Sequence, residues 1–161
     1  TVASGNLYHA EGVSTIASGI SSHAEGDSSI ASGESSHAEG DTTTASANCS
    51  HTEGFGTVAN TKSQHVQGEY NILDTAGATS IRGTYAHIVG NGTSDTDRSN
   101  AHTLDWAGNA WFAGDITLAA PAETLPEGVN LSSRLPRLYY GTIDPTDSTF
   151  GKDGDIYIKF E

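Results

Sequence analysis

Histidine and glutamate recur together in the first half of the chain, as His-x-Glu pairs fourteen residues apart. The copies that should form a regular column are His23, Glu25, His37, Glu39, His51 and Glu53. Imidazole nitrogens and carboxylate oxygens bind transition metals, and imidazole titrates near neutral pH, so the pattern could form a metal stripe or a pH-sensitive surface. The interpretation that we favour is a solvated outer face without metal, on which the two groups compensate each other.

The charge balance predicts how stability should depend on pH. The chain has 20 acidic and 7 basic residues, a formal net charge of −13. Protonation of the histidines below about pH 6.5 should relieve part of this excess of carboxylates. We therefore expect mild stabilisation at slightly acidic pH.

Two further groups of residues could do chemistry but lack essential members. Asn91, Asp95 and Asp97 are spaced like calcium ligands, but His102 stands where an EF-hand loop requires glutamate. We expect ordinary turn residues there. Ser94-Asp95 could be a self-cleavage bond, but the sequence fixes no base that would activate the serine.

The remaining residues predict no catalysis. The acidic residues follow the repeat instead of forming the paired cleft that a glycoside-cleaving enzyme needs. The aromatic residues that could stack on sugars are Trp106, Trp111, Tyr139 and Tyr140. Aromatic core residues are the commoner case, and we keep Tyr139 and Tyr140 as candidates for a ligand-binding tip. We expect a protein that is not an enzyme and has no cofactor.

Composition narrows the class of partner. The excess of acid argues against nucleic acid and anionic membranes, because both would repel the chain. Hydrophobic residues are only 35% of the 161, which by itself fits disorder better than a globular core. No apolar run approaches the roughly 18 residues of a membrane span, so we expect no membrane insertion. The single cysteine, Cys49, excludes an internal disulfide.

A repeat overturns the expectation of disorder. Glycine stands at every seventh position from Gly5 to Gly40, and the unit T-I-A-S-G-x-x-S-H-A-E-G-x-x fills residues 1–68. Glycine this frequent excludes a coiled coil, because each would cost about 1 kcal/mol in a helix. A β-solenoid fits better: fourteen residues and two short strands per coil, glycine corners of positive φ, and coils about 4.8 Å apart.

Alternation along each strand predicts which side chains face the lumen. Thr15, Ala17 and their equivalents should point inward, because so short a coil is too narrow for larger side chains. An apolar stripe then remains outside at Ile16, Ile30 and Val58. Since the lumen buries little apolar area, we expect several chains to pack around the rod axis and cover the stripe. Threefold symmetry is a natural closed arrangement.

The repeat S-x-A-S-G-x-x-S-H-A-E-G resembles the head repeats of trimeric autotransporter adhesins of the YadA type. Residues 83–115 and 138–160 are similar to segments of phage tail fibres and minor structural proteins. The resemblance implies an all-β chain: a left-handed parallel β-roll in a homotrimeric fibre, followed by a β neck and a small β tip. It places the protein on a virion tail or an extracellular particle surface.

The resemblance also implies partners and a function. The partners would be two further copies of the chain, a glycan or protein receptor on the host, and other tail or baseplate proteins. The function would be attachment of a phage or phage-tail-like particle to its host, and the absence of an autotransporter anchor favours this over a cell-bound adhesin. A bacteriocin particle, a purely structural fibre spacer, and a self-cleaving intramolecular chaperone remain as alternatives.

Beyond residue 68 the period breaks. In residues 69–118 we expect an eight-residue insertion, a last coil in which His87 restores the phase, and a neck. The neck should hold two strands around Ala107-Gly108. Trp106 and Trp111 lie in it, and we expect them in an interchain core.

The end of the chain should contain a linker and a tip. Residues 119–137 are rich in proline and predict a linker, with one helical turn near residues 131–135. Residues 138–161 predict a terminal strand pair, and the Lys152-Asp-Gly turn between the strands is a hairpin signal.

Overall fold

The computed structural model describes residues 1–4, 7–114, 138–141 and 156–159. The described chain is all-β, and none of it forms a helix that is long and apolar enough to cross a membrane. Two compact units, Thr1–Ala113 and Gly114–Glu161, are considered separately. The predicted linker at residues 119–137, with its helical turn, lies outside the described residues.

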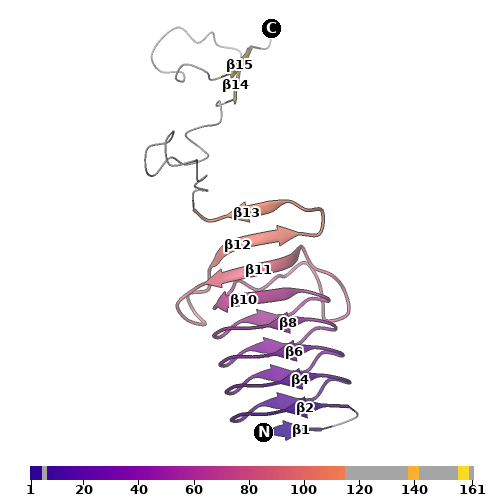
Figure 1. Ribbon diagram of the computed structural model, residues 1–161. Helices are drawn as coiled ribbons and strands as arrows, with labels where there is room; N and C mark the ends of the chain where they lie inside the picture. The colour runs from indigo at the N-terminus through magenta and orange to yellow at the C-terminus, as the bar shows by residue number, and fades with distance from the viewer. Residues whose placement is uncertain (5–6, 115–137, 142–155, 160–161) are drawn as a thin grey trace, which may run out of the picture. The chain divides into compact units, whose positions relative to one another are not determined.

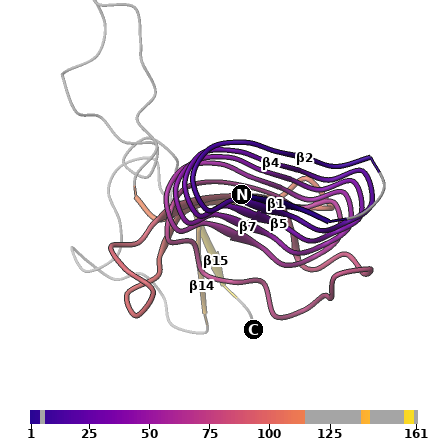
Figure 2. The same ribbon diagram turned by 90° about the horizontal axis from the view of Figure 1, so that it is seen from below.

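The repeat folds into a β-solenoid, as its period predicts (Figure 1). Each fourteen-residue coil contributes one short strand to each of two parallel sheets, and the coils overlie one another along the stack (Figure 2). Sheet A consists of β1 (Val2–Ala3), β3 (Ile16–Ala17), β5 (Ile30–Ala31), β7 (Thr44–Ala45) and β9 (Val58–Ala59). Sheet B begins with β2 (His9–Ala10), β4 (His23–Ala24), β6 (His37–Ala38), β8 (His51–Thr52) and β10 (His65–Glu69).

Small side chains fill the lumen between the two sheets, which confirms the predicted alternation. Ala17, Ala24 and Ala31 are fully buried, and so are Thr15 and Ser29. Several lumen hydroxyls donate to backbone oxygens, as Ser36 Oγ does to the Gly33 carbonyl at 2.7 Å. These bonds satisfy part of the polar core, whereas Ser22 Oγ, Thr52 Oγ1 and Thr61 Oγ1 have no hydrogen-bond partner among the described residues.

The prediction that the repeated glycines adopt positive φ is confirmed for every second glycine of the seven-residue series. Gly26, Gly40 and their fourteen-residue equivalents have positive φ, whereas Gly19 and Gly33 do not. At Gly33 the constraint is space, because a Cβ would lie 2.0 Å from the Ala47 carbonyl oxygen of the next coil. Serine, threonine and cysteine take most of the other positive-φ positions, at Ser14, Ser21, Ser28, Ser35, Thr42, Cys49 and Ser63, and Leu7, Gly56 and Tyr70 take the rest of this series.

An asparagine side chain ends sheet A. The Val58 N–H donates to Asn71 Oδ1 at 2.8 Å, and Asn71 Nδ2 donates to the Val58 carbonyl at 3.1 Å. The amide therefore takes the place of the backbone of a further strand. The chain then makes the predicted insertion and returns as β11 (Tyr85–Asn91), which pairs in parallel with β10 and places His87 opposite His65.

The pairing of sheet B changes after β11. β12 (Asn100–Asp105) and β13 (Ala110–Phe112) add as antiparallel strands around the Ala107-Gly108 turn, as the sequence predicts. In this chain Trp106 and Trp111 are 38% and 55% exposed. The described chain itself does not cover them, and the predicted interchain core stays a prediction.

The C-terminal strands differ from the prediction. β14 (Leu138–Gly141) and β15 (Ile156–Lys159) pair in parallel, with Leu138 opposite Ile156. The predicted β-hairpin of residues 138–161 is therefore wrong, because a hairpin turn joins antiparallel strands whereas parallel partners need a longer crossover connection. The side chains of Tyr139 and Tyr140 lie outside the described residues.

The close stacking of coils predicts the cost of adding one methyl group. A Cβ at Gly26, where φ is +97°, would lie 2.1 Å from the Gly40 carbonyl oxygen, whereas Gly108 has φ +90° and nothing within 4 Å. Gly108→Ala should cost about 1–2 kcal/mol from backbone conformation alone. Gly26→Ala should cost about 2–4 kcal/mol, because the steric clash is added. Urea unfolding at one chain concentration measures both; equal losses would contradict the close approach.

Candidate functional site

The histidines stack into a continuous column along sheet B. Ring centroids are 4.6 Å apart for His23 and His37, 4.8 Å for His37 and His51, and 4.6 Å for His51 and His65. The corresponding interplanar angles are 3°, 6° and 13°. The predicted spacing is confirmed, because in-register parallel strands repeat each side chain at the inter-strand distance.

The column is longer than the repeat predicts. His87 lies 5.2 Å from His65, and His102 on β12 lies 5.7 Å from His87 between ring centroids. Phe112 on β13 ends the column, 4.5 Å from His102. The restored phase predicts the place of His87, whereas His102 and Phe112 join the row through antiparallel strand pairing, which the sequence period does not reveal.

Glu25, Glu39 and Glu53 approach the histidine of the following coil, whereas Glu11 approaches His9 of its own coil. Glu25 lies 3.5 Å from His37 Nε2, Glu39 lies 3.5 Å from His51 Nε2, and Glu53 lies 3.7 Å from His65 Nε2. These Nε2 atoms are buried and have no hydrogen-bond partner in the part of the chain that the structure describes. The distances suit ion pairs if the rings are protonated, and they are too long for good hydrogen bonds.

Stacking works against protonation of the rings. Burial lowers the pKa of His51, and the neighbouring His65 and His37 lower it further, whereas Glu39 and Glu53 raise it less. The pKa of His87 is lowered in the same way, first by burial and then by His65 and His102. For His51 and His87 these directions run against the expectation that mild acid stabilises the protein, because the nearby carboxylates raise the pKa less than desolvation and ring-to-ring repulsion lower it.

Two groups of side chains have the composition of a metal site. His9, Glu11 and His23 form one, and His23, Glu25 and His37 form the other. In each group the three ligand atoms lie within 4.8 Å of one another. The sequence interpretation of a solvated face and the alternative of a metal stripe both remain compatible with this geometry.

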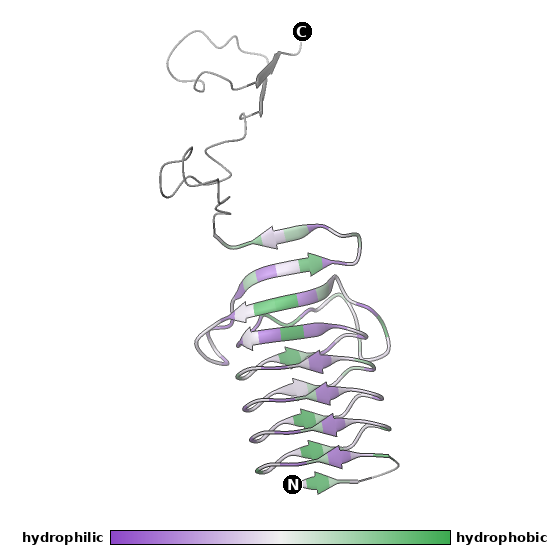
Figure 3. Ribbon diagram, in the orientation of Figure 1, coloured by the Kyte–Doolittle hydropathy of each residue, from purple (hydrophilic) through white to green (hydrophobic). Residues whose placement is uncertain are grey.

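Sheet A carries an apolar column outside the lumen. Val2, Ile16, Ile30 and Val58 lie in register, and Thr44 interrupts the column once. Ile16, Ile30 and Val58 are half-buried in the single chain, whereas the lumen residues beside them are fully buried. In Figure 3 the short strands of the solenoid form a largely hydrophobic column and a hydrophilic column.

A hollow of about 600 Å³ lies beside the antiparallel strands β12 and β13. It combines aromatic and amide side chains, including Tyr85, Trp111, Asn100 and Asn109. Its volume lies in the range of small-ligand sites. An aromatic face beside amide groups can stack on a sugar ring and hydrogen-bond its hydroxyls.

The loop between β11 and β12 is closed by its own side chains. Arg98 forms an ion pair with Asp95, and Thr93 Oγ1 donates to Asp97 at 2.6 Å. Arg98 also donates to the carbonyls of Gly56 and Asn71 at 3.1 and 3.0 Å, which ties the loop to the solenoid. These bonds fit the prediction of turn residues.

Three buried polar residues that the sequence analysis did not single out hold this end of the solenoid together. Besides Asn71, Asp74 accepts from the N–H of Tyr85 at 2.9 Å, and Asn100 accepts from the N–H of Ile72 at 2.8 Å. They lie where the period breaks, so no repeat marks them. The only available signal was the presence of Asn and Asp at the edge of an insertion.

Comparison of the chain with protein-family models, with curated proteins and with solved structures found no match. The resemblance of the repeat to adhesin heads and phage fibres therefore stays a prediction.

The lowered pKa values give stability a pH dependence. The unfolded chain takes up protons near the ordinary histidine pKa of 6.5, whereas His51 and His87 in the folded chain take them up only at lower pH. The free energy of unfolding is therefore unaffected by these two histidines above about pH 6.5, and it decreases as the pH falls below this value. We expect the Tm to fall by a few degrees between about pH 7.5 and about pH 5.5, and to fall less in His51→Gln. A Tm that rises over this range would restore the original expectation.

Proposed function

We propose that this chain is a segment of a non-catalytic homotrimeric fibre on a phage tail or tail-like particle, and that the fibre attaches the particle to its host surface. The in-register apolar column on sheet A carries the proposal. The resemblance of the repeat to adhesin heads and tail fibres supports it independently.

The described residues of the solenoid do not bury this column completely. Its lumen is filled by alanine, serine and threonine, so Ile16, Ile30 and Val58 must lie on the outer face of sheet A. Apolar surface buried between chains contributes roughly 25 cal/mol per Å². Three rods packed around a parallel axis would bury the same column on each of them, a closed arrangement that leaves no free apolar stripe.

Such a fibre would attach the particle by presenting several copies of one binding site to the host surface. Three copies of one weak site on a rigid rod bind a repetitive surface more tightly than one copy does. The hollow at Tyr85 and Trp111 has the composition of a carbohydrate site, so the ligand that we propose is a host-surface glycan. The acidic charge of the chain disfavours nucleic acid as an alternative ligand.

Oligomeric state tests the assembly. The 16.7 kDa chain should have a mass of about 50 kDa by light scattering over a dilution series. Ile30→Asp should lower the mass to that of a monomer, since it buries a charge in each interface. Ile20→Asp is the matched control, because Ile20 is 57% exposed and lies outside sheet A. A folded wild-type monomer would contradict the proposal.

Binding to a glycan array tests attachment. Trp111→Ala should lower binding by about tenfold, because stacking on an aromatic ring is lost, and it should leave the trimeric mass unchanged. Trp106→Ala is the control, because Trp106 lies under Arg82, 4.2 Å from the ring centroid, and does not line the hollow. Loss of trimer in Trp111→Ala would place this residue in the interchain core instead. A trimer that binds no glycan and no host cell would favour the structural spacer.

A further inference from the structure

His23 differs from the other histidines of the repeat because no described glutamate carboxylate lies within 4.0 Å of its ring nitrogens. His37, His51 and His65 each lie within 4.0 Å of the glutamate of the preceding coil. Between the coils of His9 and His23 this pattern changes, because Glu11 lies 3.3 Å from His9 of its own coil. The Nε2 atom of His23 is buried, and among the described residues it has no hydrogen-bond partner and belongs to no ion pair.

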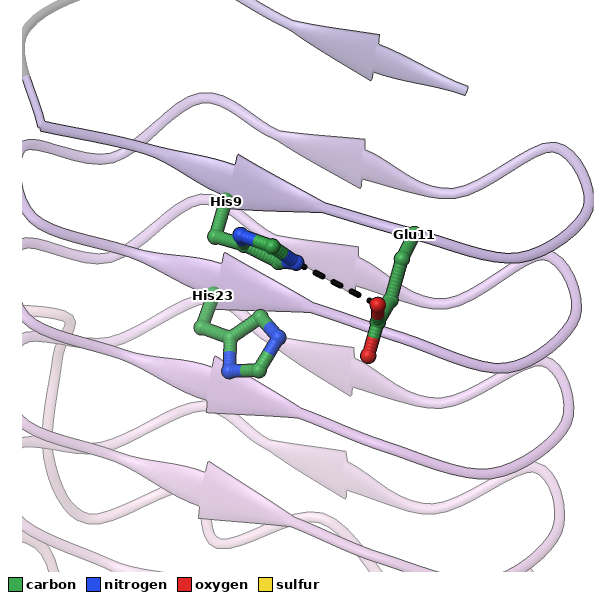
Figure 4. A group of neighbouring side chains, drawn as sticks. All are labelled: His9, Glu11 and His23. Atoms are coloured by element: carbon green, nitrogen blue, oxygen red, sulfur yellow. Dashed lines mark ion pairs between the residues drawn. The ribbon is translucent and has the colours of Figure 1, made fainter.

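His9 is turned away from the stacked arrangement of the other rings. Its plane lies at 89° to that of His23, with the centroids 4.7 Å apart. Figure 4 shows the three side chains, with His9 Nε2 directed at the Glu11 carboxylate and the His23 ring below them. An imidazole, a carboxylate and a second, unpartnered imidazole nitrogen are therefore gathered at one end of the column.

We propose that His9, Glu11 and His23 bind one divalent late transition-metal ion such as Zn²⁺. Zinc binds imidazole nitrogen and carboxylate oxygen at about 2.0–2.2 Å in a tetrahedron, whose ligand atoms are then about 3.3–3.6 Å apart. The 3.3 Å between His9 Nε2 and Glu11 Oε2 fits this separation. A water molecule would complete the tetrahedron.

The two ligands that would have to move toward the ion are exposed to solvent. The side chains of His9 and Glu11 are 62% and 57% exposed, so both can rotate to close on an ion. His23 is held by its stack with His37 and supplies a fixed ligand. A site with one anchored and two adjustable ligands requires little rearrangement of the solenoid.

The second group, His23 with Glu25 and His37, is less suited to an ion. The two rings lie nearly parallel, at 3°, so their nitrogens point the same way instead of converging. Glu25 is already 3.5 Å from His37 Nε2. Because the two groups share His23, occupation of the first removes a ligand from the second, and we expect one ion per chain.

Such an ion would join the first two coils of the described chain. His9 and His23 lie on β2 and β4, whose short strands pair over only two residues. A ligand that binds the folded chain alone raises its stability, and the gain grows with the logarithm of the ligand concentration once this exceeds the Kd. This inference concerns sheet B and does not depend on the proposed trimer or on its ligand.

Titration calorimetry of the tag-free chain with ZnCl₂ tests the site. We expect one Zn²⁺ per chain and a higher Tm with Zn²⁺, and much weaker binding of Mg²⁺, which prefers oxygen ligands. Glu11→Gln and His23→Ala should each weaken Zn²⁺ binding at least about tenfold. The matched controls are Glu53→Gln and His65→Ala, which change an equivalent pair further along the column and should bind Zn²⁺ as the wild type does.

Three results would overturn the proposal. One is the absence of saturable Zn²⁺ binding. Another is equal weakening in the control variants, which would show diffuse binding along the whole column. The third is Zn²⁺ binding by Glu11→Gln with wild-type affinity. Because Glu11 is exposed, this variant tests the site even if His23→Ala fails to fold.

Discussion

The narrow lumen is the constraint on which the other features depend. A coil of fourteen residues brings two sheets so close that only alanine, serine, threonine and a few larger residues near the end of the repeat fit between them. Every larger side chain of the repeat must lie outside. The apolar column on sheet A and the histidine column on sheet B follow from this single restriction, as does the need for glycine where one coil approaches the next.

Because successive coils pair in register, equivalent side chains form continuous columns on the outer faces of the two sheets. One half-buried isoleucine means little, but isoleucines and valines stacked in register, with a single interruption at Thr44, form an apolar strip that needs a cover. Imidazoles stacked at 4.6–4.8 Å likewise act together, because each ring shields its neighbours from water and would repel them if charged. The same geometry allows the column to differ at its first step, where His9 and Glu11 are free of the stack on one side.

The sequence predicts what is periodic and misses what is not. The coil length, the lumen residues and the return of His87 into register follow from spacing, because strand alternation and strand distance are fixed quantities. The caps at Asn71, Asp74 and Asn100 depend on side-chain hydrogen bonds across the insertion, which no local pattern encodes. The lowered pKa values of His51 and His87 depend first on burial of the rings, which the formal charge does not reveal. The parallel pairing of β14 and β15 depends on the path of the chain between them, whereas the turn signal predicts a hairpin.

The central claim is that the outer face of sheet A lies between chains. A nitroxide label at residue 30, introduced as Ile30→Cys on a Cys49→Ser background, tests this directly, because Cys49 is exposed and would otherwise be labelled too. If sheet A lies between chains, labels at residue 30 of neighbouring chains should show strong dipolar coupling, and labels introduced by His37→Cys on sheet B should show weaker coupling. Folded protein without coupling at residue 30, or with stronger coupling at residue 37, would contradict it.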